Sequence, residues 1–178
     1  MALTPFHALA FMFLYFRNKL KVDPLALAVS TTFIDLETFY YLLVGDPLDH
    51  RLLHGFALAL TIYPILVTFG VYVIERLFEE RLWRVYDRLR LEPVKVRYPL
   101  GTIYLNSFLG GFSHIFLDMF THKDMPYVIY PIAYGNPFYV GQASILVDAA
   151  VILLAIYSCF VWLRRQSPPN LKCFAKMS

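Results

Sequence analysis

The five histidines of this 178-residue chain recur beside acidic residues within apolar sequence. His114 and Asp118 are four residues apart, and His122 follows four residues later. Residues at this spacing lie on one face of an α-helix, about 6 Å apart along its axis. His114 and Asp118 can therefore share one ion, whereas we expect His114 and His122 to be too far apart to do so. Imidazole and carboxylate groups are the usual ligands of zinc, and they also suit iron and manganese.

Further histidines and carboxylates extend this candidate cluster. His50 and His54 form a second pair spaced by four residues, and His7 lies one turn into an N-terminal apolar segment. Asp35 and Glu37 are two residues apart, so a regular helix would direct only one of them to a common centre. The predicted metal ligands are His7, Asp35, His54, His114 and Asp118. The residues assigned to the surroundings of that site, or to a second metal, are His50, His122 and Asp148.

Ionisable groups inside membrane-spanning sequence are functional candidates, because each costs about 2.5–3.5 kcal/mol on insertion scales. A divalent cation would neutralise several buried carboxylates that would otherwise be protonated. The same groups could instead relay protons or bind a cation transiently, which is the chemistry of an ion- or proton-coupled transporter. A third interpretation is a non-catalytic membrane scaffold, in which the clustering of histidines is accidental.

The composition indicates a membrane protein. Hydrophobic residues make up 58% of the chain and charged residues 16%, against about 25% charged residues in soluble domains, and the mean hydropathy is +0.54. Intrinsic disorder, a disulfide-stapled secreted module and nucleic-acid binding through a basic surface fit this composition poorly. We expect one all-α, polytopic membrane domain over residues 1–178, with the lipid bilayer as its partner and no nucleic acid.

A membrane-spanning helix needs roughly 20 mostly apolar residues. Four segments meet this requirement, at residues 24–45, 55–74, 100–121 and 143–163. A shorter apolar run, Pro5–Phe16, is predicted to form a half-inserted or re-entrant helix. Thr4 suits its start, because threonine can cap free N–H groups and proline fits the first turn.

Two further segments are predicted to lie at the membrane surfaces. Glu75–Glu92 has apolar residues at helical spacing among arginines and glutamates, which predicts an amphipathic helix on the anionic inner leaflet. Docking to a partner protein is the alternative for this helix. Met125–Gly141 is rich in tyrosine and contains three prolines, which is typical of an anchor at the outer interface.

The distribution of basic residues predicts the orientation. Of the 16 lysines and arginines, 14 lie in residues 17–23, residues 75–99 and the tail after residue 163. Four alternating spans place these segments on one side, which the positive charge makes cytoplasmic. We therefore expect a multi-pass protein of the inner cell membrane, with all five histidines in its outer half or outer loops. Cys159 and Cys173 would lie near the inner end of the last span and in the tail, where no disulfide is expected.

Five short motifs are distributed between residues 4 and 141. They are TPFH at 4–7, FIDLE at 33–37, HRLLHG at 50–55, SHIFLD at 113–118 followed by THKD, and NPFYVG at 136–141. They resemble motifs of the membrane-bound, metal-dependent hydrolases of bacteria and archaea, which include a LexA-regulated inner-membrane member. That family is similar in turn to the zinc-dependent phospholipase C and P1 nuclease group. The chain departs from the family pattern at Ile34, Gly55 and Asn136, where proline, serine and tryptophan are common.

The resemblance implies a membrane-embedded hydrolase with one or two divalent metals, preferably zinc, with manganese or iron as alternatives. A metal lowers the pKa of bound water from 15.7 to about 7, which supplies hydroxide at neutral pH. Glu37 is the predicted general base. Arg51 is predicted either to hold a phosphate through bidentate hydrogen bonds or to extend to lipid headgroups. The expected substrate is a lipid or lipid-linked (phospho)ester at the outer leaflet, and an oligomer is compatible with this function.

Overall fold

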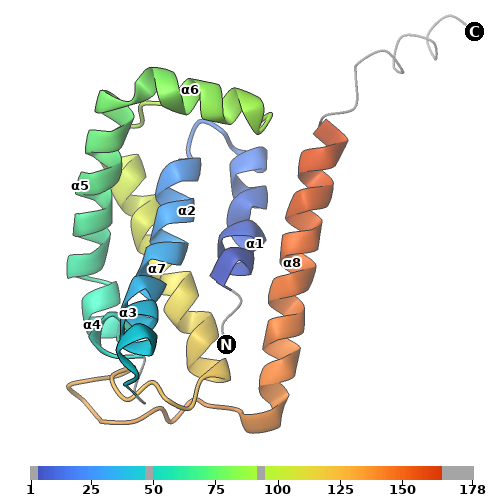
Figure 1. Cartoon of the computed structure of the whole chain (residues 1–178). Coiled ribbons are helices and arrows are strands. Elements are labelled where there is room, and N and C mark those ends of the chain that lie inside the picture. Colours follow the sequence, from blue (N-terminus) through green and yellow to red (C-terminus); the bar gives the residue numbers. More distant parts are fainter. Residues whose placement is uncertain (1–3, 47–49, 92–94, 166–178) are drawn as a thin grey trace, which may run out of the picture.

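The computed structural model describes residues 4–46, 50–91 and 95–165, and within these ranges the chain is helical and contains no strand. Long helical segments run side by side, α6 lies across one end of the bundle, and the segment between α7 and α8 crosses the opposite end (Figure 1). The elements in chain order are α1 (Thr4–Arg17), α2 (Pro24–Thr32), η1 (Phe33–Asp35), α3 (Leu36–Val44), η2 (Leu52–His54), α4 (Phe56–Ala59), α5 (Ile62–Leu77), α6 (Glu79–Arg88), α7 (Leu100–Thr121), η3 (Gly141–Ala143) and α8 (Ser144–Arg165). The prediction of an all-α fold is confirmed.

Three helical stretches are long and apolar enough to span a membrane, which indicates a membrane protein. They are Pro24–Val44, Phe56–Leu77 and Gly141–Arg165, close to three of the four predicted spans. The fourth predicted span coincides with α7, a helix of 22 residues that is not among these apolar stretches. The reason is the buried polar face of α7, which carries Asn106, Ser107, His114 and Asp118.

The most apolar surface of the bundle faces outward. Leu43, Phe69 and Leu146 are 69%, 68% and 71% exposed, although they lie on the three apolar stretches. A soluble protein rarely exposes so much contiguous apolar surface, whereas hydrocarbon covers it without cost. The buried core lies between α2, α5 and α7 and contains Ala26, Ile34, Tyr63, Val67, Ile103 and Ile115.

The N-terminal helix forms where the sequence predicts one. α1 has 14 residues, which corresponds to about 21 Å and is shorter than the roughly 30 Å hydrocarbon core of a bilayer. It packs between α2 and α8, in the half of the bundle nearer to α6 (Figure 1).

The predicted amphipathic helix is shorter than the segment Glu75–Glu92. The chain leaves helical geometry at Phe78, so α5 ends at Leu77 and α6 spans Glu79–Arg88, while Glu92 lies outside the described residues. Glu75 is not on the surface but fully buried, where its Oε2 accepts the Tyr98 backbone N–H at 2.9 Å. The tail residues Lys172, Cys173 and Lys176 also lie outside the described residues.

Candidate metal centre

Three segments that are distant in sequence bring four candidate ligands together. His114 and Asp118 project from consecutive turns of α7, Asp35 ends η1, and His54 ends η2. One ligand atom from each of these four residues lies within 4.8 Å of the others. Two donors bonded to one ion at 2.0–2.2 Å are at most about 4.4 Å apart. A contraction of a few tenths of an ångström would therefore suit a shared ion.

The 3-10 turn η1 explains why Asp35 and Glu37 act on the same residue. Asp35 Oδ1 lies 3.2 Å from His54 Nε2, and Glu37 Oε2 lies 3.2 Å from His54 Nδ1. The tighter turn before α3 places the two carboxylates on opposite edges of one imidazole. Asp35 faces the centre, whereas Glu37 lies behind His54. The prediction that only one of the two carboxylates reaches the centre agrees with this geometry.

Glu37 also holds the chain that carries His54. Its Oε2 accepts the backbone N–H groups of Arg51 and Leu53, at 3.2 and 3.0 Å. The carboxylate therefore orients both the imidazole and the η2 turn. Carboxylates that hydrogen-bond the outer nitrogen of a histidine ligand fix its tautomer and its orientation.

His114 is oriented by a backbone group instead. It is fully buried, and its Nδ1 donates to the Thr31 carbonyl oxygen, 2.8 Å away on α2. Its Nε2 faces Asp118 Oδ2 at 2.9 Å and Asp35 Oδ1 at 3.2 Å.

The backbone contact of His114 assigns the proton on its imidazole. Nδ1 of His114 donates to the Thr31 carbonyl, so a neutral His114 carries a lone pair at Nε2, whereas each nitrogen of His54 lies 3.2 Å from a carboxylate oxygen. The His114 lone pair then faces Asp35 Oδ1 at 3.2 Å and Asp118 Oδ2 at 2.9 Å. Acceptors that face acceptors in a buried site require a cation between them, either a bound proton or a metal ion. The donor set fits zinc, with nitrogen and carboxylate ligands.

A second group of ligand atoms adjoins the first. Single atoms of His50, Asp118 and His122 lie within 4.8 Å of one another, and the two imidazole rings are 4.5 Å apart between centroids. Burial lowers the pKa of His122, which favours the neutral form that binds metals. Asp118 belongs to both groups, whereas His114 and His122 are in different groups, as their spacing predicts.

His7 borders the first group without joining it. Its Nε2 lies 3.7 Å from Asp118 Oδ1, and its ring centroid lies 4.8 Å from that of His114. The side chain is buried, and its Nδ1 has no hydrogen-bond partner among the described residues.

The other predicted site residues lie farther out. Arg51 pairs with Asp46, and its guanidinium lies 4.1 Å from the centroid of the Tyr41 ring. Asp148 is half-buried on α8 and belongs to neither group of ligand atoms. The roles predicted for Arg51 and Asp148 therefore stay predictions.

The sequence analysis missed one residue that contacts this cluster. Asp124 Oδ2 lies 2.9 Å from His50 Nδ1, and its Oδ1 lies 3.8 Å from His122 Nδ1, so this carboxylate links the two histidines of the second group. Its position two residues after His122 in the THKD motif was the available signal. Helical spacing could not find it, because α7 ends at Thr121.

The fold and the site together define a helical protein of membrane type with a buried cluster of histidines and aspartates. Residues 1–134 match a family described as a domain of unknown function, DUF4184, and the chain belongs to this family. The matched residues include both groups of ligand atoms, whereas α8 follows them. No curated protein and no solved structure matches the chain.

Proposed function

We propose that this protein is a membrane-embedded, metal-dependent hydrolase. The observation that carries the proposal is the convergence of the His54 and His114 Nε2 atoms on Asp35 Oδ1, at 3.2 Å each, with the His114 Nδ1 proton donated to Thr31. A buried acceptor nitrogen aimed at carboxylate oxygens favours a cation in their midst. The motif resemblance to membrane-bound metal-dependent hydrolases is the second support.

We propose zinc as the metal, with manganese or iron as alternatives. When bound, the metal would supply an activated water nucleophile and polarise the scissile ester. Asp35, His54, His114 and Asp118 would hold the first ion, with His7 beside it. Asp118, His50 and His122 would hold a second ion, with Asp118 common to both.

The chain's own residues divide the remaining tasks. Glu37 and the Thr31 carbonyl would orient the two central imidazoles. Glu37 is also the proposed general base.

The proposed substrate is a lipid or lipid-linked phosphoester. The candidate centre lies toward the end of the bundle opposite α6, near α3 and the segment between α7 and α8 (Figure 1). Arg51 is at the edge of the site, with its side chain 32% exposed. Arg51 would release Asp46 and bind a phosphate through two parallel hydrogen bonds.

We further propose that α7 crosses the membrane as a fourth helix, shielded from lipid by its neighbours, and that α1 inserts halfway. Charged and polar groups within a membrane face the bundle interior or a water-filled cavity, and the polar residues of α7 are buried. The basic segments would then be cytoplasmic and the metal centre would open to the outer side.

Metal content tests the first half of the proposal. Protein purified in detergent without chelators should contain one or two equivalents of a transition metal per chain, measured by elemental analysis. His114→Ala and Asp118→Ala should lose the first ion, and Asp118→Ala the second as well, whereas His122→Ala should lose only the second. Ser113→Ala on the same helix is the matched control and should keep the wild-type content. Wild-type protein without any transition metal would remove the proposal.

Hydrolysis tests the second half. Metal-loaded wild-type protein in mixed micelles should release product from a fluorescent phospholipid, and a chelator should abolish the release until zinc is restored. An ion-coupled carrier is the rival function, because buried polar residues such as Asn106 and Ser107 continue from the site along α7. Proton flux in proteoliposomes without tightly bound metal or hydrolysis would favour the carrier.

A further inference from the structure

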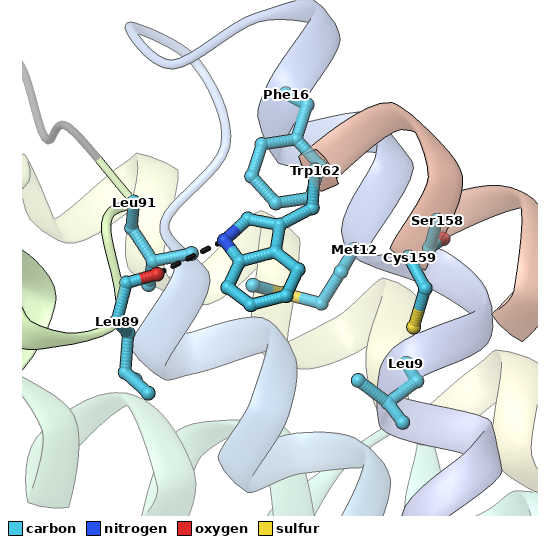
Figure 2. A pocket seen from close by; sticks show the side chains of 8 residues that line it. All are labelled: Leu9, Met12, Phe16, Leu89, Leu91, Ser158, Cys159 and Trp162. Atoms are coloured by element: carbon cyan, nitrogen blue, oxygen red, sulfur yellow. Dashed lines mark hydrogen bonds between the residues drawn. The ribbon is translucent and has the colours of Figure 1, made fainter. Parts of the chain in front are cut away.

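An apolar groove distinct from the metal centre lies between α1, α8 and the segment that follows α6. It encloses about 250 Å³, and its lining is drawn in Figure 2. The lining residues are Leu9, Met12 and Phe16 from α1, Leu89 and Leu91 after α6, and Ser158, Cys159 and Trp162 from α8. None of them belongs to the two groups of candidate ligands.

The few polar groups of this lining are turned away from the groove. Ser158 Oγ accepts the Phe13 backbone N–H at 3.1 Å and donates to the Ala10 carbonyl at 3.3 Å. Trp162 Nε1 donates to the Leu89 carbonyl at 2.9 Å, which joins α8 to the segment after α6 (Figure 2). With its hydroxyl and indole N–H satisfied by the backbone, the groove offers no hydrogen bond to a polar ligand and suits a hydrocarbon chain.

The size of the groove also suits a hydrocarbon chain. A water molecule occupies about 30 Å³ of the liquid, and a methylene group is similar in size, so the groove accommodates roughly eight methylene groups in a row. The helix α8 is one of the apolar stretches that can span a membrane. Tryptophan is typical of the level of the lipid headgroups, which places Trp162 and this end of the groove near the membrane surface.

Arginines in three segments adjoin lining residues of this end of the groove in sequence. Arg17 follows Phe16, Arg88 and Arg90 flank Leu89, and Arg164 and Arg165 follow Trp162 within three residues. Arg165 also contacts the Phe16 carbonyl, which joins α8 to α1 at this point. Asp87 is the acidic residue of the described chain adjoining this rim in sequence, so the rim carries a marked positive charge.

We propose that this groove binds one acyl chain of an anionic phospholipid, whose phosphate is held by the arginine rim. An apolar slot that ends in a cluster of cations is complementary to a lipid with a hydrocarbon tail and a negative headgroup. Basic pockets between membrane helices recognise anionic lipids in this manner. The proposal does not rest on the hydrolase function, because the groove and the metal centre share no residue.

The bound lipid would connect α8 to the rest of the bundle. Among the described helices, α8 packs chiefly on α1 and more sparsely on α7. An acyl chain between Leu89, Cys159 and Trp162 would extend this contact to the segment after α6.

The fluorescence of Trp162 provides the test. The chain has two tryptophans, Trp83 and Trp162, so Trp83→Phe leaves Trp162 as the reporter in otherwise full-length protein. In phosphatidylcholine vesicles, brominated phosphatidylglycerol should quench Trp162 at about tenfold lower mole fraction than brominated phosphatidylcholine. Equal quenching by the two brominated lipids would overturn the proposal.

Further variants distinguish lipid binding in the groove from attraction to a positively charged surface. Arg88→Gln with Arg164→Gln should abolish most of the preference for phosphatidylglycerol. Arg81→Gln with Arg84→Gln removes the same charge from α6 nearer to α5 and should change the preference less than twofold. An equal loss in both pairs would show attraction to the surface alone. Cys159→Phe, which fills the groove and keeps every arginine, should also abolish the preference, and its retention in that variant would overturn the proposal.

Discussion

At the residue scale, the Glu37 carboxylate has two proposed roles, as the group that orients His54 and as the general base. It touches His54 Nδ1 and two backbone N–H groups through Oε2. A residue that only orients a ligand acts on metal affinity, whereas a general base acts on the reaction rate. The two roles therefore give different signatures when the charge alone is removed.

Glu37→Gln should weaken zinc binding by about 10- to 100-fold, as the loss of such orienting partners typically does. Competition with a chelator of known affinity measures this change. Asp87→Asn, which alters an exposed carboxylate on α6, is the control and should leave zinc affinity unchanged. Unaltered affinity in Glu37→Gln together with a lower turnover of the zinc-loaded protein would assign Glu37 to base catalysis alone.

The residue scale is also where sequence patterns predict most of the site. The spacing of His114, Asp118 and His122 already separates two ligand groups, because it depends only on helix geometry. The joint action of Asp35 and Glu37 on His54 could not be predicted, since it depends on the 3-10 turn η1. Asp124 was missed because it follows the helix, where no periodicity applies.

At the scale of elements, a buried carboxyl group caps the N-terminus of α2. The Asp23 carboxylate caps this helix by accepting the N–H groups of Leu25 and Ala26, at 2.9 and 3.2 Å. Burial raises the pKa of Asp23 to about 6, although these hydrogen bonds and the charge of Lys95 oppose the rise. The buried Glu75 carboxyl is its hydrogen-bonding neighbour.

Stability should therefore fall as pH rises through the interval between the two pKa values of Asp23. The folded state holds the proton up to a pKa of about 6, whereas the unfolded chain releases it near 3.8. Ionisation of Asp23 beside the buried Glu75 carboxyl therefore costs stability as the pH rises. Asp23→Asn keeps a capping oxygen and should flatten this slope in thermal unfolding of metal-free protein between pH 4 and 7. The exposed Asp87→Asn is the control, and an unchanged slope in Asp23→Asn would contradict the assignment.

The contact between α2 and α7 depends on a missing side chain. A Cβ on Gly110 would lie 2.8 Å from Ser30 Cβ and in hard contact with Ser30 Oγ. Gly110→Ala should therefore destabilise the protein by about 1–3 kcal/mol, the usual cost of overpacking. Gly70→Ala on α5 meets no atom within 4 Å and should stabilise by about 0.5–1 kcal/mol through helix propensity.

Thermal unfolding in detergent, followed by tryptophan fluorescence, measures both alanine variants. Ser30→Gly combined with Gly110→Ala should recover part of the lost stability, because it removes the Ser30 side chain with which the new methyl group clashes. No recovery in the double variant would show that the contact with Ser30 is not the cause.

The same element scale explains why only part of the bundle was predictable. The stretches Pro24–Val44, Phe56–Leu77 and Gly141–Arg165 follow the apolar runs of the sequence, because lipid-facing helices must be apolar along their length. The break at Phe78 and the crossing of α6 are tertiary features without a glycine or proline to announce them. The composition of α7 does not identify this helix as a span, because its polar residues are directed into the bundle.

At the scale of the whole molecule, the orientation in the membrane depends on that ambiguous helix. Four spans place α6 and the segment after α7 on opposite sides of the membrane. Three spans, without α7, place these two segments on the same side. If α7 crosses, the basic α6 and the histidine-bearing end lie on opposite sides of the membrane. If it does not, the segment after α7 lies on the same side as α6, whereas His50 and His54, which precede the span Phe56–Leu77, lie on the other side.

Single cysteines should distinguish the two arrangements. In a background with Cys159 and Cys173 replaced by serine, Arg84→Cys on α6 and Lys123→Cys after α7 are exposed positions. A membrane-impermeant maleimide added to intact spheroplasts should label Lys123→Cys at once and Arg84→Cys only after lysis, because positive charge stays in the cytoplasm. The reverse pattern would turn the metal centre toward the cytoplasm. Labelling of both cysteines from one side would mean that α7 does not cross, and its buried histidine and aspartate would then need another route to water.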